Sequence, residues 1–211
     1  MNDNQNEVKV TKRLNRLISS SGVHELRKVE KGNILKNKRF RGTVQDWYGK
    51  KAPWPMIESD LILVFEDHSK AIDDNLIAAI EIKFFKQSQN LDKQLRQAYR
   101  EFGQPLRNLM YGFDSVALWH VFDETIDERK IRNYTTIVGD TITKLNLPVV
   151  YLATKISEDR FKIFQPWALD YNDMNYILRS LKGLFENKRN PLSQSEIKEY
   201  RDALKVTLAI P

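Results

Sequence analysis

Residues 77–85, Ile-Ala-Ala-Ile-Glu-Ile-Lys-Phe-Phe, place two charged side chains inside an otherwise apolar stretch. A stretch this rich in Ile and Phe predicts a strand buried on both faces, where charges need partners. Because side chains alternate along a strand, Glu81 and Lys83 fall on one side of the sheet, roughly 6.6–6.8 Å apart along it. We interpret the pair as a candidate functional site.

A second apolar stretch, residues 55–65, carries Asp60 immediately before Leu-Ile-Leu-Val-Phe. Residues 66–75 are polar and typical of a turn, so the two apolar stretches are predicted to form an antiparallel hairpin. This pairing brings Asp60 beside Glu81 and gathers two carboxylates and one ammonium at one edge of the sheet. The simpler alternative is a buried structural salt bridge between Glu81 and Lys83.

The composition narrows the class of protein. A chain of 211 residues fits one medium-sized domain. The formal net charge of +6 favours polyanionic partners such as nucleic acid. Because cysteine is absent, disulfides, thiolate metal sites and cysteine nucleophiles are excluded. The N-terminus is polar and no apolar stretch reaches the about 18 residues of a membrane helix, so we expect a soluble, intracellular, cytoplasmic protein without a membrane partner.

The remaining periodicities predict one α/β domain with helices and strands along its whole length. Further strands are expected over residues 23–29, 115–122, 149–154 and 160–164. Helices are expected over residues 7–20, 90–111 (as one helix or a pair, broken near Pro105), 127–147, 170–187 and 193–205.

The first predicted helix adds a third candidate acid. Apolar residues recur there at helical spacing, beginning with Val10 and Leu14, and Glu7 falls on the same face three residues before Val10. A carboxylate at a helix start also complements the helix dipole, which is the simpler explanation. Glu25, in the following predicted strand, is a second candidate for a third acid.

Residues 33–55 form the least regular stretch and interleave basic with aromatic side chains. This combination suits a phosphate backbone and exposed bases, although a solvated loop pinned to the core by its aromatic residues explains it equally well. The candidate nucleic-acid-binding residues are Lys36, Lys38, Arg39, Arg41, Lys50, Lys51 and Trp54.

Other chemistries find little support in the sequence. No glycine-rich phosphate loop is present, so no nucleotide cofactor is expected, and the three histidines lack metal-ligand spacing. Carboxylate oxygens are hard ligands that suit Mg²⁺ or Mn²⁺. Asp60 and Glu81 would hold such an ion, with the backbone carbonyl of Ile82 as a further ligand and Lys83 beside the attacking water or the phosphate.

The order of Asp60 before one apolar strand and Glu81-Ile82-Lys83 in the next resembles the PD-(D/E)xK nuclease superfamily. Pro55 precedes Asp60 at a looser distance than is usual there. The resemblance implies a restriction-endonuclease-like αβββαβ core over about residues 5–125, with a mixed central sheet flanked by helices. Residues 126–211 would then form a C-terminal extension of strands and helices within a single nuclease-like domain.

Within that superfamily, the chain is similar to archaeal Holliday-junction resolvases and related nucleases of archaeal viruses and plasmids. Glu7, Val10 and Leu14 match the acid and aliphatic residues that such resolvases carry on the first helix, and Gln94 matches a glutamine that some branches carry after the lysine strand. The resemblance implies metal-dependent hydrolysis of DNA, with branched or junction DNA among the candidate substrates. A viral source would place the protein in the host cell cytoplasm.

A nuclease that cuts both strands of a duplex or junction needs two sites, so a homodimer is expected. Two other classes of function remain open. A catalytically silent nucleic-acid-binding protein of the same fold would bind DNA without any effect of metal. A basic protein-interaction module would instead bind an acidic partner and show no salt-dependent affinity for DNA.

Overall fold

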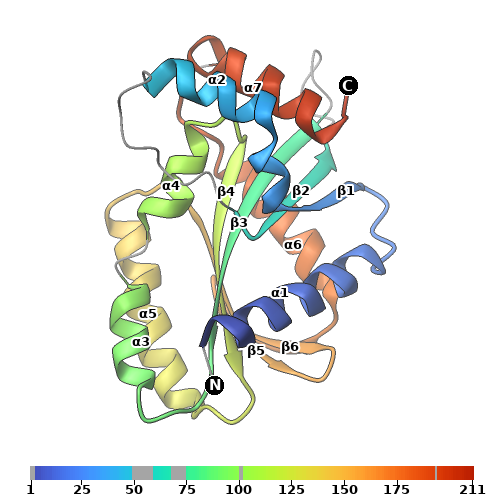
Figure 1. The fold of residues 1–211 in the computed structure, drawn as a ribbon. Helices are drawn as coiled ribbons and strands as arrows, with labels where there is room; N and C mark the ends of the chain where they lie inside the picture. Colours follow the sequence, from blue (N-terminus) through green and yellow to red (C-terminus); the bar gives the residue numbers. More distant parts are fainter. Residues whose placement is uncertain (1–2, 49–58, 68–74, 100–101, 193) are drawn as a thin grey trace.

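The chain forms a mixed α/β fold in which helices cover both faces of a seven-stranded sheet (Figure 1). The computed structural model describes residues 3–48, 59–67, 75–99, 102–192 and 194–211. Among these residues, no helix combines the length and the apolar character needed to cross a bilayer.

The strands lie side by side in the order of the sequence. Only β3–β4 and β4–β5 are parallel pairs, and the other neighbours are antiparallel. Parallel neighbours need a crossover connection, which helices provide in both cases. The strands are β1 (Leu26–Lys31), β2 (Leu61–Glu66), β3 (Asn75–Phe85), β4 (Ser115–Asp123), β5 (Val150–Ser157), β6 (Arg160–Gln165) and β7 (Leu169–Asn172).

The helices pack on both faces of the sheet, and Figure 1 shows them to its left, to its right and across its top. One hydrophobic cluster joins α1 (Asp3–Ser19) and α6 (Met174–Asn187) to one face of the sheet. A second cluster joins the opposite face to the remaining helices. These are the 3-10 helix η1 (Gly32–Lys36), α2 (Lys38–Tyr48), α3 (Leu91–Ala98), α4 (Gly103–Leu109), α5 (Glu128–Lys144) and α7 (Gln194–Leu208).

The central strand β3 is buried on both faces, as its sequence predicts. Ile77 and Ala79 belong to one hydrophobic cluster, whereas Ala78 and Ile80 belong to the other. Side-chain alternation therefore directs Glu81 and Lys83 to the face that α3, α4 and α5 cover. The antiparallel hairpin of β2 and β3 is confirmed.

Several predicted elements are wrong in their boundaries, including the first helix, which begins at Asp3 and not at residue 7. The first strand begins at Leu26, not at residue 23, and Glu25 lies in the turn before it. Residues 90–111 form the two helices α3 and α4, but Pro105 lies in the first turn of α4, where a missing N–H costs little, and the break comes earlier. The start of predicted helix 170–187 is the edge strand β7, and α6 begins after Asp173, whose side chain caps it.

The stretch 33–55 is more regular than expected, because η1 and α2 lie within its described part. Phe40 and Val44 are one helical turn apart and both are buried. The Phe40 ring packs edge-on against Tyr111, with their centroids 6.3 Å apart. The α2 helix is therefore amphipathic and buries its apolar face. The interleaved charged and aromatic residues made this pattern hard to recognise in the sequence.

The C-terminal third extends the central sheet with the strands β5, β6 and β7. On α7, Arg201 reaches back to β3 and β4. Its guanidinium forms a buried ion pair with Asp114 at 2.7 Å and donates to the carbonyl oxygen of Asn75 at 3.0 Å. Asp114 in turn accepts a hydrogen bond from the backbone N–H of Ile77 at 2.8 Å.

Candidate active site

Asp60 is held against β3 through its backbone and its carboxylate. Its backbone N–H donates to the carbonyl oxygen of Ile80 at 3.1 Å, and its Oδ2 accepts from the backbone N–H of Ile82 at 2.7 Å. Leu61 pairs with Ile80, so the same register continued by one residue sets Asp60 beside Glu81. The hairpin therefore brings the two acids to neighbouring positions on adjacent strands.

Glu81 and Lys83 form an ion pair on β3. The Lys83 Nζ lies 3.4 Å from Glu81 Oε1, and the two side chains are 20% and 3% exposed. Edge strand β1 carries a pair of the same spacing and length, Lys28 with Glu30 at 3.4 Å, but its side chains are 28% and 32% exposed. Burial distinguishes the β3 pair, because a buried charge depends strongly on its partner.

A close backbone contact holds the end of β1 against Asp60. Gly32 begins η1, and its backbone N–H donates to the carbonyl oxygen of Asp60 at 3.3 Å. A Cβ on residue 32 would lie only 1.5 Å from the carbonyl oxygen of Ser59, so no other residue fits without displacement of the backbone. Because residue 32 is glycine, Lys31 and Asn33 can lie close to Asp60.

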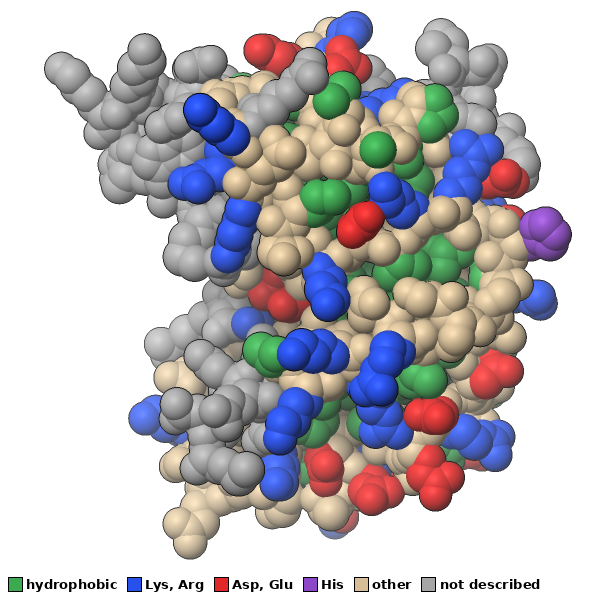
Figure 2. Space-filling model, turned by 45° about the vertical axis from the view of Figure 1, so that its right-hand side comes forward, with side chains coloured by type: hydrophobic (Ala, Val, Ile, Leu, Met, Phe, Trp, Pro, Cys, Tyr) green, Lys and Arg blue, Asp and Glu red, His purple; other side chains and the backbone are tan. Residues whose placement is uncertain are grey.

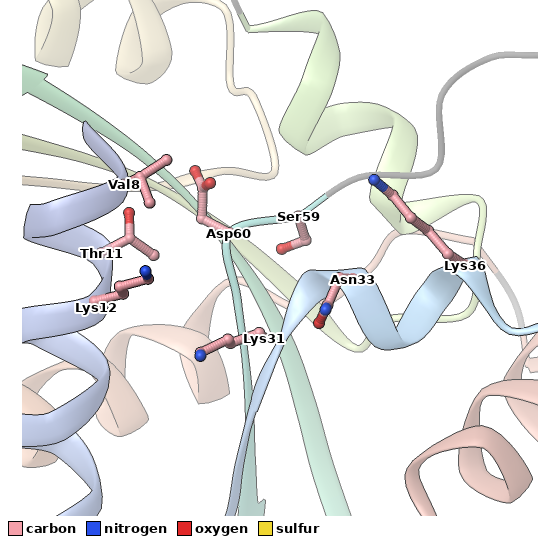
Figure 3. Close-up of a pocket in the computed structure, with 8 residues that line it drawn as sticks. All are labelled: Val8, Thr11, Lys12, Lys31, Asn33, Lys36, Ser59 and Asp60. Carbon is pink, nitrogen blue, oxygen red and sulfur yellow. The ribbon is translucent and has the colours of Figure 1, made fainter. Parts of the chain in front are cut away.

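A cleft opens beside Asp60, between the N-terminal half of α1 and η1 (Figure 3). Its volume is about 490 Å³, which is in the range of small-ligand sites. The described lining residues are Val8, Thr11 and Lys12 from α1, Lys31, Asn33 and Lys36 from β1 and η1, and Ser59 and Asp60 at the start of β2.

The two alternatives for a third acid lie in different places. Glu7 belongs to α1, next to Val8 and one helical turn before Thr11, both of which line the cleft. Its own side chain lies outside the described part of the structure. The Glu25 carbonyl oxygen accepts from the backbone N–H of Glu66, at the end of β2 remote from Asp60. The geometry therefore favours the helix that carries Glu7.

Gln94 lies half-buried on α3, which packs on the sheet face that carries Glu81 and Lys83. The backbone carbonyl of Ile82 belongs to β3, while its side chain faces the opposite cluster. The roles predicted for both residues stay predictions.

The predicted nucleic-acid-binding residues are only partly together. Lys36 lines the cleft, whereas Lys38 and Arg41 are exposed on α2. The Arg39 side chain and the whole of Lys50, Lys51 and Trp54 lie outside the described residues. The sequence analysis missed Lys12, Lys31 and Asn33, although the sequence Lys-Gly-Asn at the end of a strand was a usable signal of a tight, basic turn.

A buried histidine stands beside Lys83. His120 on β4 pairs with Lys83 in the parallel register and is fully buried. Its Nδ1 lies 2.9 Å from the hydroxyl of Tyr151. Burial, with a smaller contribution from the positive charge of Lys83, lowers the pKa of His120 to about 3, so the imidazole is neutral at pH 7. Burial also raises the pKa of Tyr151 above its usual range.

The donor set fits a hard divalent ion with water in most positions. Among the described residues, no group of three or more His, Cys, Asp or Glu side chains gathers as a metal cage. Mg²⁺ rarely needs one, since it keeps several waters and binds through one or two carboxylates and a substrate phosphate. Asp60 and Glu81 supply two carboxylates, and α1, the helix that carries Glu7, lines the same cleft as Asp60.

Comparisons with protein-family models, with curated proteins and with solved structures find no match to this chain. The fold and the site therefore define a class only in general terms. The protein has a mixed α/β fold with a seven-stranded sheet, which carries a buried acid–lysine pair, and Asp60 lines a basic cleft.

Proposed function

We propose that the protein is a nuclease of the PD-(D/E)xK type that hydrolyses DNA phosphodiester bonds with Mg²⁺ or Mn²⁺, and that it works as a homodimer. One observation carries the proposal: Asp60 and Glu81 lie at neighbouring positions of an antiparallel hairpin, and Lys83 contacts Glu81 at 3.4 Å. From α1 to β4, the element order resembles that of a restriction-endonuclease-like core with η1 and α2 inserted between β1 and β2, which supports the same proposal.

The residues divide the chemistry between them. Asp60 and Glu81 would hold the ion, which lowers the pKa of a bound water and neutralises charge on the phosphate. Glu81 lies 3.4 Å from Lys83 on the buried strand β3 and so holds the ammonium beside the metal position. The Lys83 ammonium is then placed to orient the attacking water and to stabilise the negative charge that develops on phosphorus. The Ile82 N–H fixes the orientation of the Asp60 carboxylate.

Cleavage assays with labelled DNAs test the proposal. Linear duplex, single strand, flap and four-way junction are incubated with Mg²⁺, Mn²⁺ or EDTA, using wild-type protein and the Glu81→Gln variant. We expect metal-dependent cutting that Glu81→Gln reduces by at least about 100-fold, because the ion loses a charged ligand. The preferred DNA would then define the branch of nuclease.

Glu30→Gln is the matched control, because it breaks an ion pair of the same spacing and distance on β1. It should cut as the wild type does. Binding without cutting under every condition would refute the nuclease and favour the silent binder. If Lys83→Ala unfolds the protein and Glu81→Gln cuts normally, the pair is a structural salt bridge.

A further inference from the structure

The walls of the cleft beside Asp60 carry positive charge and hydrogen-bond donors. Lys12 lies on the α1 wall, and Lys31 and Lys36 lie on the opposite wall (Figure 3). Asn33 adds an amide, and Asp60 is the one acid among the described lining residues. Such a lining suits a ligand with closely spaced negative charges.

Two of these lysines have no acidic partner among the described residues. Within the described part of the chain, Lys12 and Lys31 are exposed and have no acidic group within the 4.0 Å of an ion pair. On other helices, Lys144 and Lys198 are each paired with an acid one turn away, Asp140 and Asp202. Figure 2 shows the Lys and Arg side chains gathering over the left and centre of one face.

We infer that the cleft binds the sugar-phosphate backbone of one nucleic-acid strand, with Lys12 and Lys31 contacting phosphates next to the one at Asp60 and Glu81. The inference rests on the proposed function and adds α1 and the end of β1 to the substrate-binding surface. Lys31 reaches this position because Gly32 permits the backbone contact with Ser59.

The lining also predicts how the strand is read. No aromatic side chain lines the cleft among its described residues, so bases have no stacking platform there. Lysine, asparagine and hydroxyl groups contact phosphate and sugar, which position a strand but carry no sequence information. Binding should therefore be independent of base sequence and strongly dependent on salt.

The test measures binding in EDTA, where no metal-dependent cutting occurs. A fluorescein-labelled 20-nucleotide strand, alone or annealed to its complement, is titrated with protein at several KCl concentrations. The variants are wild type, Lys12→Ala/Lys31→Ala, and Lys144→Ala/Lys198→Ala, which changes the net charge equally away from the cleft. Thermal melting checks that each variant is folded, and Lys12→Glu serves as a second, single-site variant.

We expect Lys12→Ala/Lys31→Ala to weaken binding by about 10-fold or more near 0.1 M KCl, and to lower the slope of log K against log salt. For two lost phosphate contacts, the slope should decrease by about 1.4 with the single strand and by about 1.8 with the duplex. The charge reversal Lys12→Glu should weaken binding more than the loss of one lysine does in the double variant. The control variant Lys144→Ala/Lys198→Ala should change the affinity by less than about 2-fold.

The inference and the proposed function fail in different ways. If the cleft variants bind DNA with wild-type affinity and wild-type salt slope, the inference is overturned, whether or not the protein cuts. If the wild type never cuts but the cleft variants lose affinity, the binding cleft stands and the nuclease does not. Equal losses in the cleft and control variants would show only a general charge effect and also overturn the inference.

Discussion

Substitution of Gly32 by alanine tests whether the corner between β1 and η1 holds the cleft together. A Cβ at this position lies 1.5 Å from the carbonyl oxygen of Ser59 and 2.3 Å from its carbonyl carbon. Real Cβ contacts essentially never fall under 3.0 Å, so the backbone must separate by at least about 1.5 Å. The 3.3 Å hydrogen bond from Gly32 N–H to Asp60 does not survive such a shift.

The magnitude follows from these two losses. Overpacking of a well-packed site costs about 1–3 kcal/mol, and loss of one backbone hydrogen bond costs about 1 kcal/mol. The lower entropy of alanine in the unfolded chain offsets about 0.5–1 kcal/mol. We therefore expect Gly32→Ala to lower the free energy of unfolding by about 1–3.5 kcal/mol, which for this size of chain lowers Tm by about 2–14 °C.

Urea unfolding followed by circular dichroism measures the change. Gly42→Ala is the matched control, because a Cβ there meets nothing within 4 Å on the helix α2. Alanine is the better helix former, so this variant should gain about 0.5–1 kcal/mol. If Gly32→Ala unfolds at the wild-type urea midpoint, the close contact does not exist as described. The same displacement should also weaken DNA binding, because Lys31 moves with the corner.

Three further predictions concern buried charge, protonation and the metal. Arg201→Met leaves Asp114 buried without its 2.7 Å ion pair and should cost about 3–5 kcal/mol in urea unfolding; a loss under about 1 kcal/mol would contradict this. Burial lowers the pKa of His120 to about 3, so as pH falls the unfolded chain, with a pKa near 6.5, binds the proton first. The stability that neutral His120 contributes is therefore fully present above about pH 6.5 and is lost as pH falls towards about 3. In His120→Phe, the urea midpoint should depend less on pH across that window. The same pH dependence as in the wild type would refute this prediction. Asp60→Asn can still accept from the Ile82 N–H, so Tm should stay within about 2 °C while cutting falls by at least about 100-fold; wild-type activity would remove Asp60 from the metal site.

The arrangement of Asp60, Glu81 and Lys83 was predictable because it depends on local patterns. The alternation of side chains fixes which face Glu81 and Lys83 share, and a polar turn between two apolar stretches predicts the hairpin that brings Asp60 beside Glu81. The register that the structure shows, Leu61 with Ile80, agrees with that pairing. Composition likewise indicated a basic α/β protein without thiol chemistry.

Other parts of the site could not be predicted, because they depend on contacts between residues far apart in the sequence. Lys12 and Lys31 come together only when α1 packs beside the end of β1. His120 stands beside Lys83 because a parallel crossover sets β4 next to β3.

The sequence by itself determined the strand that carries Glu81 and Lys83, the hairpin that begins after Asp60, and the chemistry that carboxylates and lysine can perform. Tertiary structure alone decided where the cleft opens, which acid stands near it and which lysines line it. The physical reason is that periodicity reports only which residues of one element share a face, whereas packing of distant elements decides what that face meets. Gly32 illustrates this limit. The backbone that would clash with a Cβ at position 32 is that of Ser59, which lies just before β2 and is far from Gly32 in the sequence.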